Sequence, residues 1–206
     1  MLETKNLRFK YDNNLELNFP NIKTSKENLL ILGASGVGKT TFLHLLSGLL
    51  KPMNGEIDLL GTKISNLKMS EMDRFRGKNI GIVFQKPHFI NSLTVKENLQ
   101  LAQYISKKSD KNRVQSLLES LGIEDKANKK TQNLSQGEKQ RVSIALAIVN
   151  SPKLILADEP TSSLDDLNCH KVINILKNQA SKYKAKLIII THDYRLKKHF
   201  KNTLSL

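Results

Sequence analysis

Hydrophobic and polar residues alternate along the start of the chain. The alternation over 2–9, and again over 15–19, predicts two half-exposed strands on either side of the turn Asp12-Asn13-Asn14. Another strand is expected over 56–60, after the turn Asn54-Gly55. Because strands with one polar face are typical of antiparallel sheets, the first two are expected to form an antiparallel sheet at the edge of the fold.

Short apolar segments predict a second kind of strand. Segments 28–32 and 80–84 are apolar on both faces, as buried parallel strands are, and strand signals return at 153–157 and 186–191. Helices are expected between them over 38–49, over 165–182, and from a cap at Ser70 to Arg76. This alternation predicts an α/β fold with a mostly parallel sheet flanked by helices.

The pattern changes to helical between about 86 and 150. Helical periodicity covers 95–106 and 111–121, which Ser109-Asp110 separates, and Ser135 is placed to cap a third helix that runs to 149. We therefore expect one domain over 1–206, in which a helical subdomain of about 86–150 is inserted into the α/β core.

Charge and cysteine content narrow the setting of the protein. Among 206 residues, 33 Lys and Arg against 19 Asp and Glu give a net charge of +14, which suits a nucleotide, a nucleic acid or an anionic membrane surface. Because the lysines are scattered or paired, a solvated basic surface is the favoured interpretation. Cys169 is the only cysteine, so an intrachain disulfide is excluded and a reducing compartment is expected. We expect no signal peptide and no membrane span, because no apolar segment is long enough.

A glycine-rich turn joins the strand at 28–32 to the following helix. Its sequence is Gly33-Ala34-Ser35-Gly36-Val37-Gly38-Lys39-Thr40, with Thr41 next. Glycines let consecutive backbone N–H groups point at phosphate oxygens, and the helix adds its positive N-terminal end. We expect these residues to bind ATP, with Lys39 reaching the β- and γ-phosphates and Thr40 binding Mg²⁺.

Two carboxylates stand at the end of another apolar strand. Asp158 and Glu159 follow Leu154-Ile155-Leu156-Ala157, and open parallel sheets bind ligands at such strand ends. Asp158 is expected to hold Mg²⁺ through water, while Glu159 polarises the attacking water. Acidic residues also commonly begin loops, but the phosphate-binding loop in the same chain favours the catalytic interpretation.

Five further motifs occur in a recognisable order. They are Tyr11, Gln85, the segment Leu134-Ser135-Gln136-Gly137-Glu138, the segment Ser162-Ser163-Leu164-Asp165, and Thr191-His192-Asp193. Together with the glycine-rich loop they resemble the motifs of ATP-binding cassette ATPases over nearly the whole chain. The resemblance implies a P-loop, RecA-like core, with Gln85 as a Mg²⁺ ligand and His192 as a donor to the γ-phosphate. It also implies that Tyr11 stacks on adenine, although its spacing from Leu7 and Phe9 leaves a core-facing role open.

The resemblance also implies a dimer that binds ATP between its subunits. In this family two cassettes associate head to tail, so Ser135 and Gly137 would complete the phosphate site of the other copy, with Asp165 beside it. The signature segment departs from the commonest family form at Gln136 and Glu138. This departure leaves open the backbone geometry at Gln136 and whether Glu138 lowers the affinity for ATP.

A separately encoded membrane permease is the implied partner. Segments 74–85 and 93–98 resemble the subgroup that serves lipoprotein release, macrolide export and cell division, which places the chain in the cytoplasm on the inner face of the membrane. We expect contact through 86–93, where Phe89 and Ile90 are predicted to be exposed, although they could simply cap the helical subdomain. A nucleic-acid ATPase of the same superfamily is the alternative, but its usual second cassette, coiled coil or zinc insert is absent from the sequence. A non-hydrolytic cassette would be expected to lack Glu159 or His192.

Overall fold

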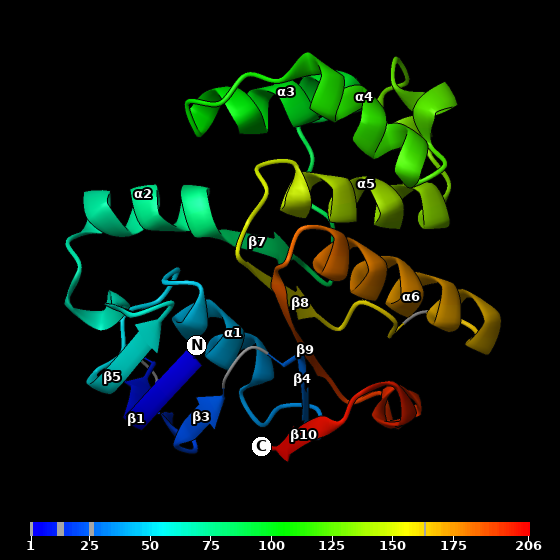
Figure 1. Cartoon of the computed structure of the whole chain (residues 1–206). Coiled ribbons are helices and arrows are strands. Elements are labelled where there is room, and N and C mark those ends of the chain that lie inside the picture. Colours follow the sequence, from blue (N-terminus) through cyan, green and yellow to red (C-terminus); the bar gives the residue numbers. More distant parts are fainter. Residues whose placement is uncertain (1, 12–14, 25–26, 163) are drawn as a thin grey trace.

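Two sheets and a set of helices make up the protein (Figure 1). The computed structural model describes residues 2–11, 15–24, 27–162 and 164–206, so the predicted turn at 12–14 and Ser163 lie outside the described residues. The strands are β1 (Leu2–Lys10), β2 (Glu16–Asn18), β3 (Ile22–Thr24), β4 (Leu29–Leu32), β5 (Asn54–Leu59), β6 (Thr62–Lys63), β7 (Ile80–Val83), β8 (Leu154–Asp158), β9 (Lys186–Thr191) and β10 (Asn202–Ser205). The α-helices are α1 (Lys39–Leu46), α2 (Met69–Asn79), α3 (Val95–Ile105), α4 (Lys111–Ser120), α5 (Gln136–Ile148) and α6 (Asp166–Lys182). Short 3-10 helices are η1 (Ile64–Asn66), η2 (Glu124–Lys126), η3 (Thr131–Asn133) and η4 (Tyr194–His199).

The parallel sheet positions the site. Its strands run in the order β10-β4-β9-β8-β7, and each neighbouring pair is parallel. Ile190 of β9 lies opposite Ile31 of β4 on one side and Asp158 of β8 on the other. The chain segments that leave β4, β8 and β9 therefore emerge side by side at one edge of the sheet.

The parallel sheet is buried on both faces, which explains its continuous apolar segments. Along β4, Leu30 and Leu32 pack into one core with α3, α4, α5 and α6, whereas Leu29 and Ile31 pack into a second core with α1 and the antiparallel sheet. Removing one such side chain from water contributes roughly 1.5–3 kcal/mol. The predicted α/β fold with a mostly parallel sheet flanked by helices is confirmed.

The antiparallel sheet is larger than predicted. The pairing of β1 with β2 is confirmed, but β1 also pairs with β3 and β5, and β6 extends the sheet beyond β5. Sequence analysis missed β3, β6 and β10, which are two to four residues long. Such short strands give too few alternating positions to be recognised, and their pairing with longer strands fixes them.

The boundaries of two helices differ from the prediction. Helix α2 begins at Met69 with Lys68 as its N-cap, so the predicted cap at Ser70 is wrong, and it continues to Asn79. The carboxylate of Glu71 accepts the backbone N–H of Lys68 at 2.9 Å, which satisfies the helix start in place of a serine hydroxyl. Helix α1 ends at Leu46, because the chain turns at Gly48, whose φ is +64°.

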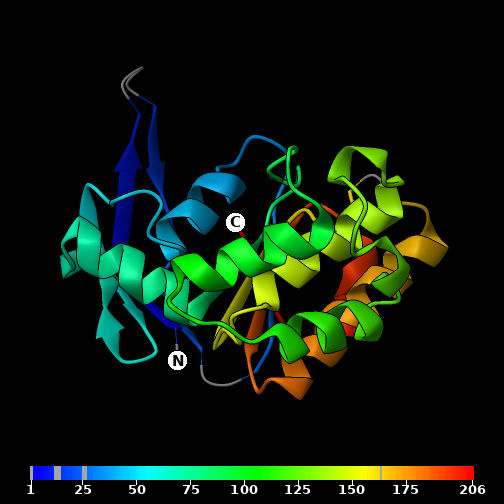
Figure 2. The same cartoon turned by 90° about the horizontal axis from the view of Figure 1, so that it is seen from above.

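The helices predicted between 86 and 150 are present as α3, α4 and α5. Helices α3 and α4 lie over α5, and α5 packs on β7 (Figures 1 and 2). Gly81 permits this close approach, because a Cβ there would lie 2.0 Å from the carbonyl oxygen of Ala147. No helix within 2–11, 15–24, 27–162 and 164–206 is long and apolar enough to cross a membrane.

The segment 86–93 differs from the prediction at one of its two apolar residues. Ile90 is exposed as expected, but Phe89 is half-buried and packs against the core shared with α3 and α5. Asn98 fixes this segment, since its side chain accepts the backbone N–H of Ile90 at 2.9 Å and donates to the carbonyl of Ile90 at 3.2 Å. For Phe89 the capping interpretation is therefore the correct one.

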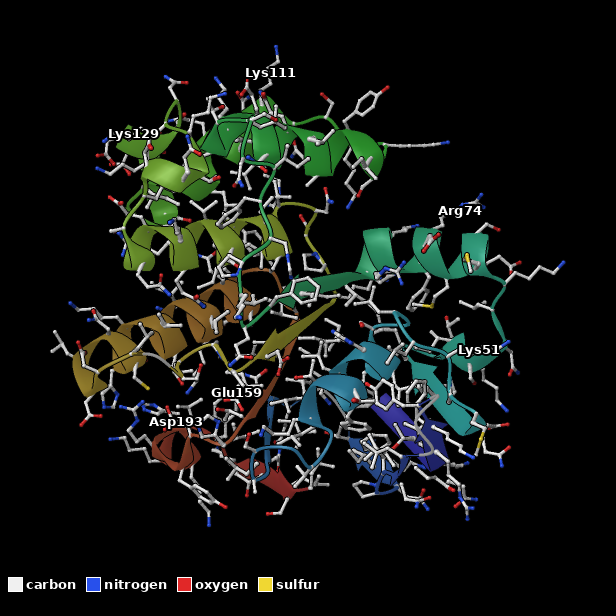
Figure 3. All side chains as sticks on the ribbon, turned by 180° about the vertical axis from the view of Figure 1, so that it is seen from behind. Lys51, Arg74, Lys111, Lys129, Glu159 and Asp193 are labelled. Atoms are coloured by element: carbon white, nitrogen blue, oxygen red, sulfur yellow. The ribbon has the colours of Figure 1, made fainter. Side chains whose placement is uncertain are left out.

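The positive charge is spread over the surface. The exposed cations Lys111 and Lys129 lie over the helical part of the molecule, and the exposed cations Arg74 and Lys51 lie at another side (Figure 3). This distribution agrees with a solvated basic surface.

One lysine is buried and gives the stability a pH dependence. Lys186 at the start of β9 donates to the hydroxyl of Thr24 at 2.9 Å, and burial lowers its pKa to about 8 although Glu27 opposes the shift. The unfolded chain then binds more protons between pH 8 and 10.5, so stability should rise with pH in this window. Relative to Lys186→Met, the free energy of unfolding should rise by about 2–3 kcal/mol between pH 7.5 and 10.5. Urea unfolding of both chains across this range measures it, and parallel pH curves would contradict it.

Candidate functional site

The glycine-rich loop lies between β4 and α1 at the edge where the parallel strands end. Gly36 and Gly38 adopt φ values of +87° and +93°, which L-residues with a Cβ rarely adopt. Gly38 is the N-cap of α1 and offers no side-chain acceptor to the helix, so the first N–H groups of α1 remain available to an anion.

Lys39 is buried at the mouth of this loop. Its ammonium group donates to the carbonyl of Ala34 at 2.9 Å and lies 3.2 Å from Oε1 of Glu159. A cation held between the loop and a carboxylate is placed to meet phosphate oxygens that enter the loop.

Thr40 and Asp158 form the second part of the site. The hydroxyl of Thr40 donates to Oδ2 of Asp158 at 2.8 Å, while Oδ1 of Asp158 is buried without a partner among the described residues. Burial raises the pKa of Asp158, and the bond from Thr40 only partly offsets it. A hydroxyl and a carboxylate with a free oxygen fit Mg²⁺, which prefers oxygen ligands and few protein groups. Within the described chain no three His, Cys, Asp or Glu side chains cluster as a metal site.

Glu159 is held by several donors. The hydroxyl of Thr191 donates to Oε2 at 2.6 Å, and Nδ1 of His192 lies 2.8 Å from Oε1. Burial by itself would raise the pKa of Glu159, but these bonds and the one from Lys39 outweigh it and lower the pKa. The backbone of Glu159 adopts a φ of +46°, in the left-handed region. For any residue except glycine this conformation costs about 1 kcal/mol of free energy. Glu159 is therefore kept ionised and fixed at the strand end.

These groups surround one cavity of about 300 Å³. It is lined by Ser35, Gly36, Gly38, Lys39, Thr40, Thr41, Gln85, Glu159 and His192. The side chain of His192 is 52% exposed and that of Gln85 is exposed, so both can reach a molecule in the cavity. The structure thus brings together the glycine-rich loop, the second carboxylate, the glutamine and the histidine that the sequence predicted from separate segments.

Tyr11 stands beside this cavity. Its hydroxyl lies 2.7 Å from the hydroxyl of Thr41, and its ring meets the edge of Phe9 at a centroid distance of 4.8 Å. With 38% of the residue exposed, Tyr11 is not a core residue, so the core-facing alternative is wrong. A partly exposed aromatic side chain can stack on a flat ligand.

The signature segment does not line this cavity. Ser135 caps α5, its backbone N–H donates to Glu138 at 2.7 Å, and Ser135, Gln136 and Gly137 are exposed. The bond from the Ser135 backbone is the main cause that lowers the pKa of Glu138 to about 2, and Lys126 lies 3.2 Å from the same carboxylate. Glu138 therefore serves the capping box, which is a structural reason for a carboxylate at this departure from the common motif.

Asp165 also lies outside the cavity. It is the N-cap of α6 and accepts the backbone N–H of Asn168 at 2.8 Å, and this bond is the main cause that lowers its pKa. The side chain is exposed.

Sequence analysis gave no role to several residues behind the cavity. Thr191 bonds Glu159, while Asp193 is buried and bonds both Thr161 and Arg195. The only signal in the sequence is that Thr191 and Asp193 flank His192. Their contacts depend on β8 and β9 lying side by side.

Comparison with known proteins agrees with this geometry. The family model described as "ABC transporter" matches residues 17–162. The lipoprotein-releasing system ATP-binding protein LolD of Buchnera aphidicola subsp. Acyrthosiphon pisum (strain APS) is 40% identical over 79% of this chain and 73% of its own length. LolD of Wigglesworthia glossinidia brevipalpis is 36% identical over 94% of this chain and 84% of its own.

A solved structure shares the whole fold. The dimeric, post-hydrolysis structure of the ATP-binding cassette MJ0796 bound to ADP and Pi matches with a TM-score of 0.90 at 30% identity, covering 100% of this chain and 94% of that one. Since the family model covers most of the sequence and a relative 40% identical covers 79% of it, the chain belongs to the ABC transporter family, as an ATP-binding and ATP-hydrolysing subunit.

Proposed function

We propose that this subunit hydrolyses ATP with Mg²⁺ at the cavity between the glycine-rich loop and Glu159. The observation that carries the proposal is the convergence of Lys39, Thr40, Glu159 and His192 on one cavity at the ends of parallel strands. Asp158 lies directly behind Thr40 and accepts its hydroxyl. Thr40 and Asp158 would hold the ion, which neutralises charge on the phosphates when bound.

The hydrolytic step is assigned to Glu159. Its lowered pKa keeps the carboxylate ionised at neutral pH, so it can accept a hydrogen bond from a water that attacks the γ-phosphate. Lys39, now 3.2 Å from Glu159, would turn to the phosphates, so that the water could take its place at Oε1 beside the bonds from His192. His192 remains as the donor to the γ-phosphate, since its ring reaches both Glu159 and the cavity.

A second copy is proposed to complete each site. Ser135 and Gly137 are exposed at the N-terminal end of α5, outside the cavity of their own chain. A helix start with exposed N–H groups is suited to a phosphate. Two copies would pair head to tail around two ATP molecules. This pairing would bring the helix end of one copy to the γ-phosphate bound by the other, while Tyr11 of the ATP-binding copy stacks on the adenine.

The permease is proposed to bind a separate cavity of about 560 Å³. This cavity lies between α2, β7, α3 and α5, and its lining includes Phe84, His88 and Ile105. His88 is the residue of the segment 86–93 that lines this cavity, and α3 lines it as well. The proposed contact region therefore extends from this segment to α3. Gln85 lines the nucleotide cavity and stands in the sequence between Phe84 and His88, which line the second cavity. Movement of Gln85 would therefore couple the nucleotide to the permease and to a helical subdomain of about 86–150.

The two LolD relatives favour lipoprotein release as the process served. The subunit would then act in the cytoplasm, on the inner face of the membrane and bound to the lipoprotein-releasing permease.

Replacing Ile105 with Asp tests the permease site. Ile105 is 72% exposed, so the charge should leave the fold and ATP hydrolysis intact while reducing permease binding at least tenfold, because a desolvated carboxylate would be left in the interface. The assay is copurification of the tagged subunit with the lipoprotein-releasing permease of the same genome, in detergent. Met53→Asp is the control, since Met53 is 52% exposed outside this cavity. Equal permease recovery with both variants would refute the assignment.

A further inference from the structure

A polar cluster lies next to His192, around Asp193. The carboxylate of Asp193, which is buried, accepts two parallel bonds from Arg195, from Nε to Oδ1 at 2.8 Å and from Nη2 to Oδ2 at 2.8 Å. It also accepts the hydroxyl of Thr161 at 2.8 Å. A bidentate guanidinium–carboxylate pair is among the strong and directional hydrogen-bonded pairs in proteins. Arg195 is also the main cause that lowers the pKa of Asp193 to about 2.

Arg195 extends from this cluster to the segment before α6. Its Nη2 donates to the carbonyl of Leu164 at 3.2 Å, and its Nη1 donates to Asp166 at 2.5 Å. The side chain of Asp166 is 80% exposed, so that ion pair contributes little, whereas the carbonyl of Leu164 is a fixed backbone acceptor. Arg195 therefore bridges the segment after His192 and the residues on both sides of Asp165.

The cluster is also connected to the catalytic carboxylate. The backbone N–H of Asp193 donates to the hydroxyl of Thr191 at 3.0 Å, and that hydroxyl donates to Glu159 at 2.6 Å. Asp193 and Glu159 lie at the same end of the sheet (Figure 3). His192 stands between Thr191 and Asp193, so a shift of Asp193 would displace the histidine. It would also weaken the hydrogen bond from the Thr191 hydroxyl to Glu159.

We propose that Arg195 is a positioning residue for ATP hydrolysis. It fastens Leu164 and Asp166, and through Asp193 also Thr161, to the segment that carries His192. Movement of Asp165 on contact with a second copy would then reach His192 and Glu159 through one rigid cluster. A lysine could not replace it fully, because an ammonium group lacks the planar fork that binds Asp193 and Leu164 together. The inference rests on the proposed assignment of Glu159 and His192.

Steady-state ATP hydrolysis by Arg195→Ala tests the proposal. We expect kcat to fall about tenfold, equivalent to about 1.4 kcal/mol in the barrier, while the KM for ATP changes less than threefold. This split is expected because Arg195 does not line the nucleotide cavity. ATP-binding stoichiometry and the melting temperature report whether the variant is folded. Arg195→Lys should recover part of kcat.

Lys198→Ala is the matched control, since it removes an exposed cation from the same 3-10 helix and should keep the wild-type kcat. A wild-type kcat in Arg195→Ala would overturn the proposal. If Arg195→Ala does not fold, Arg195→Lys decides, because full activity in that variant would equally overturn it. Failure of the wild-type chain to hydrolyse ATP would instead contradict the proposed function.

Discussion

Glu159→Gln is expected to bind ATP and to hydrolyse it at least about 100-fold more slowly than the wild-type chain. An amide can still accept the bond from Thr191, but it cannot take a proton from the attacking water, and general-base catalysis contributes about 10²–10⁴ in rate. The substitution also removes the ion pair with Lys39 and so leaves that cation for the phosphates. Release of inorganic phosphate at saturating ATP and Mg²⁺ measures the rate, and titration with a fluorescent ATP analogue measures binding.

Lys39→Ala provides the contrast. It removes the buried cation at the loop, so nucleotide binding itself should weaken at least about tenfold, in keeping with 1.4 kcal/mol or more for a charged hydrogen bond. Chelating Mg²⁺ should stop hydrolysis in the wild-type chain without unfolding it. Wild-type turnover in Glu159→Gln would show that another group activates the water.

The parallel core of the fold was predictable because its strands carry a strong signal. Segments such as 28–32 are apolar on both faces, and only a sheet covered on both sides satisfies that pattern. The missed strands β3, β6 and β10 form because they pair with the strands β1, β5 and β4, and their own composition does not indicate a strand. In the same way Ser70 resembles a cap, yet the N-cap of α2 lies two residues earlier in the sequence, where the carboxylate of Glu71 accepts the backbone N–H of Lys68.

The site shows the same division. The glycine-rich loop and the pair Asp158 and Glu159 are local in sequence, and their meeting follows from the parallel arrangement of β4 and β8 around β9. The contact of Arg195 with Leu164 could not be predicted, because these residues are 31 positions apart and meet only through the packing of α6 beside β9. Likewise the sequence does not show that Phe89 turns toward the core, since this depends on the bonds that Asn98 makes to the neighbouring Ile90.

The second large effect concerns assembly. Glu159→Gln with ATP and Mg²⁺ is expected to double in mass from 23.3 kDa, because unhydrolysed ATP would stay bound between the loop of one copy and the helix start at Ser135 of the other. Adding Ser135→Arg should abolish the doubling, since a long cation would occupy the place where Ser135 and Gly137 meet the phosphate. Light scattering coupled to size exclusion measures the mass with and without ATP.

Two controls separate assembly from folding. Ser181→Arg places the same side chain at an exposed position near the end of α6 and should leave the ATP-dependent dimer intact. Ser135→Ala removes the cap of α5, at a cost of about 1 kcal/mol, together with the hydroxyl proposed to meet the phosphate, but it adds no bulk or charge. It therefore separates the effect of losing the serine from that of the added arginine. A Glu159→Gln chain that binds ATP but stays monomeric, even with the permease present, would show that Ser135 and Gly137 do not complete a partner's site. A dimer that survives Ser135→Arg would instead show that the two copies meet through another surface.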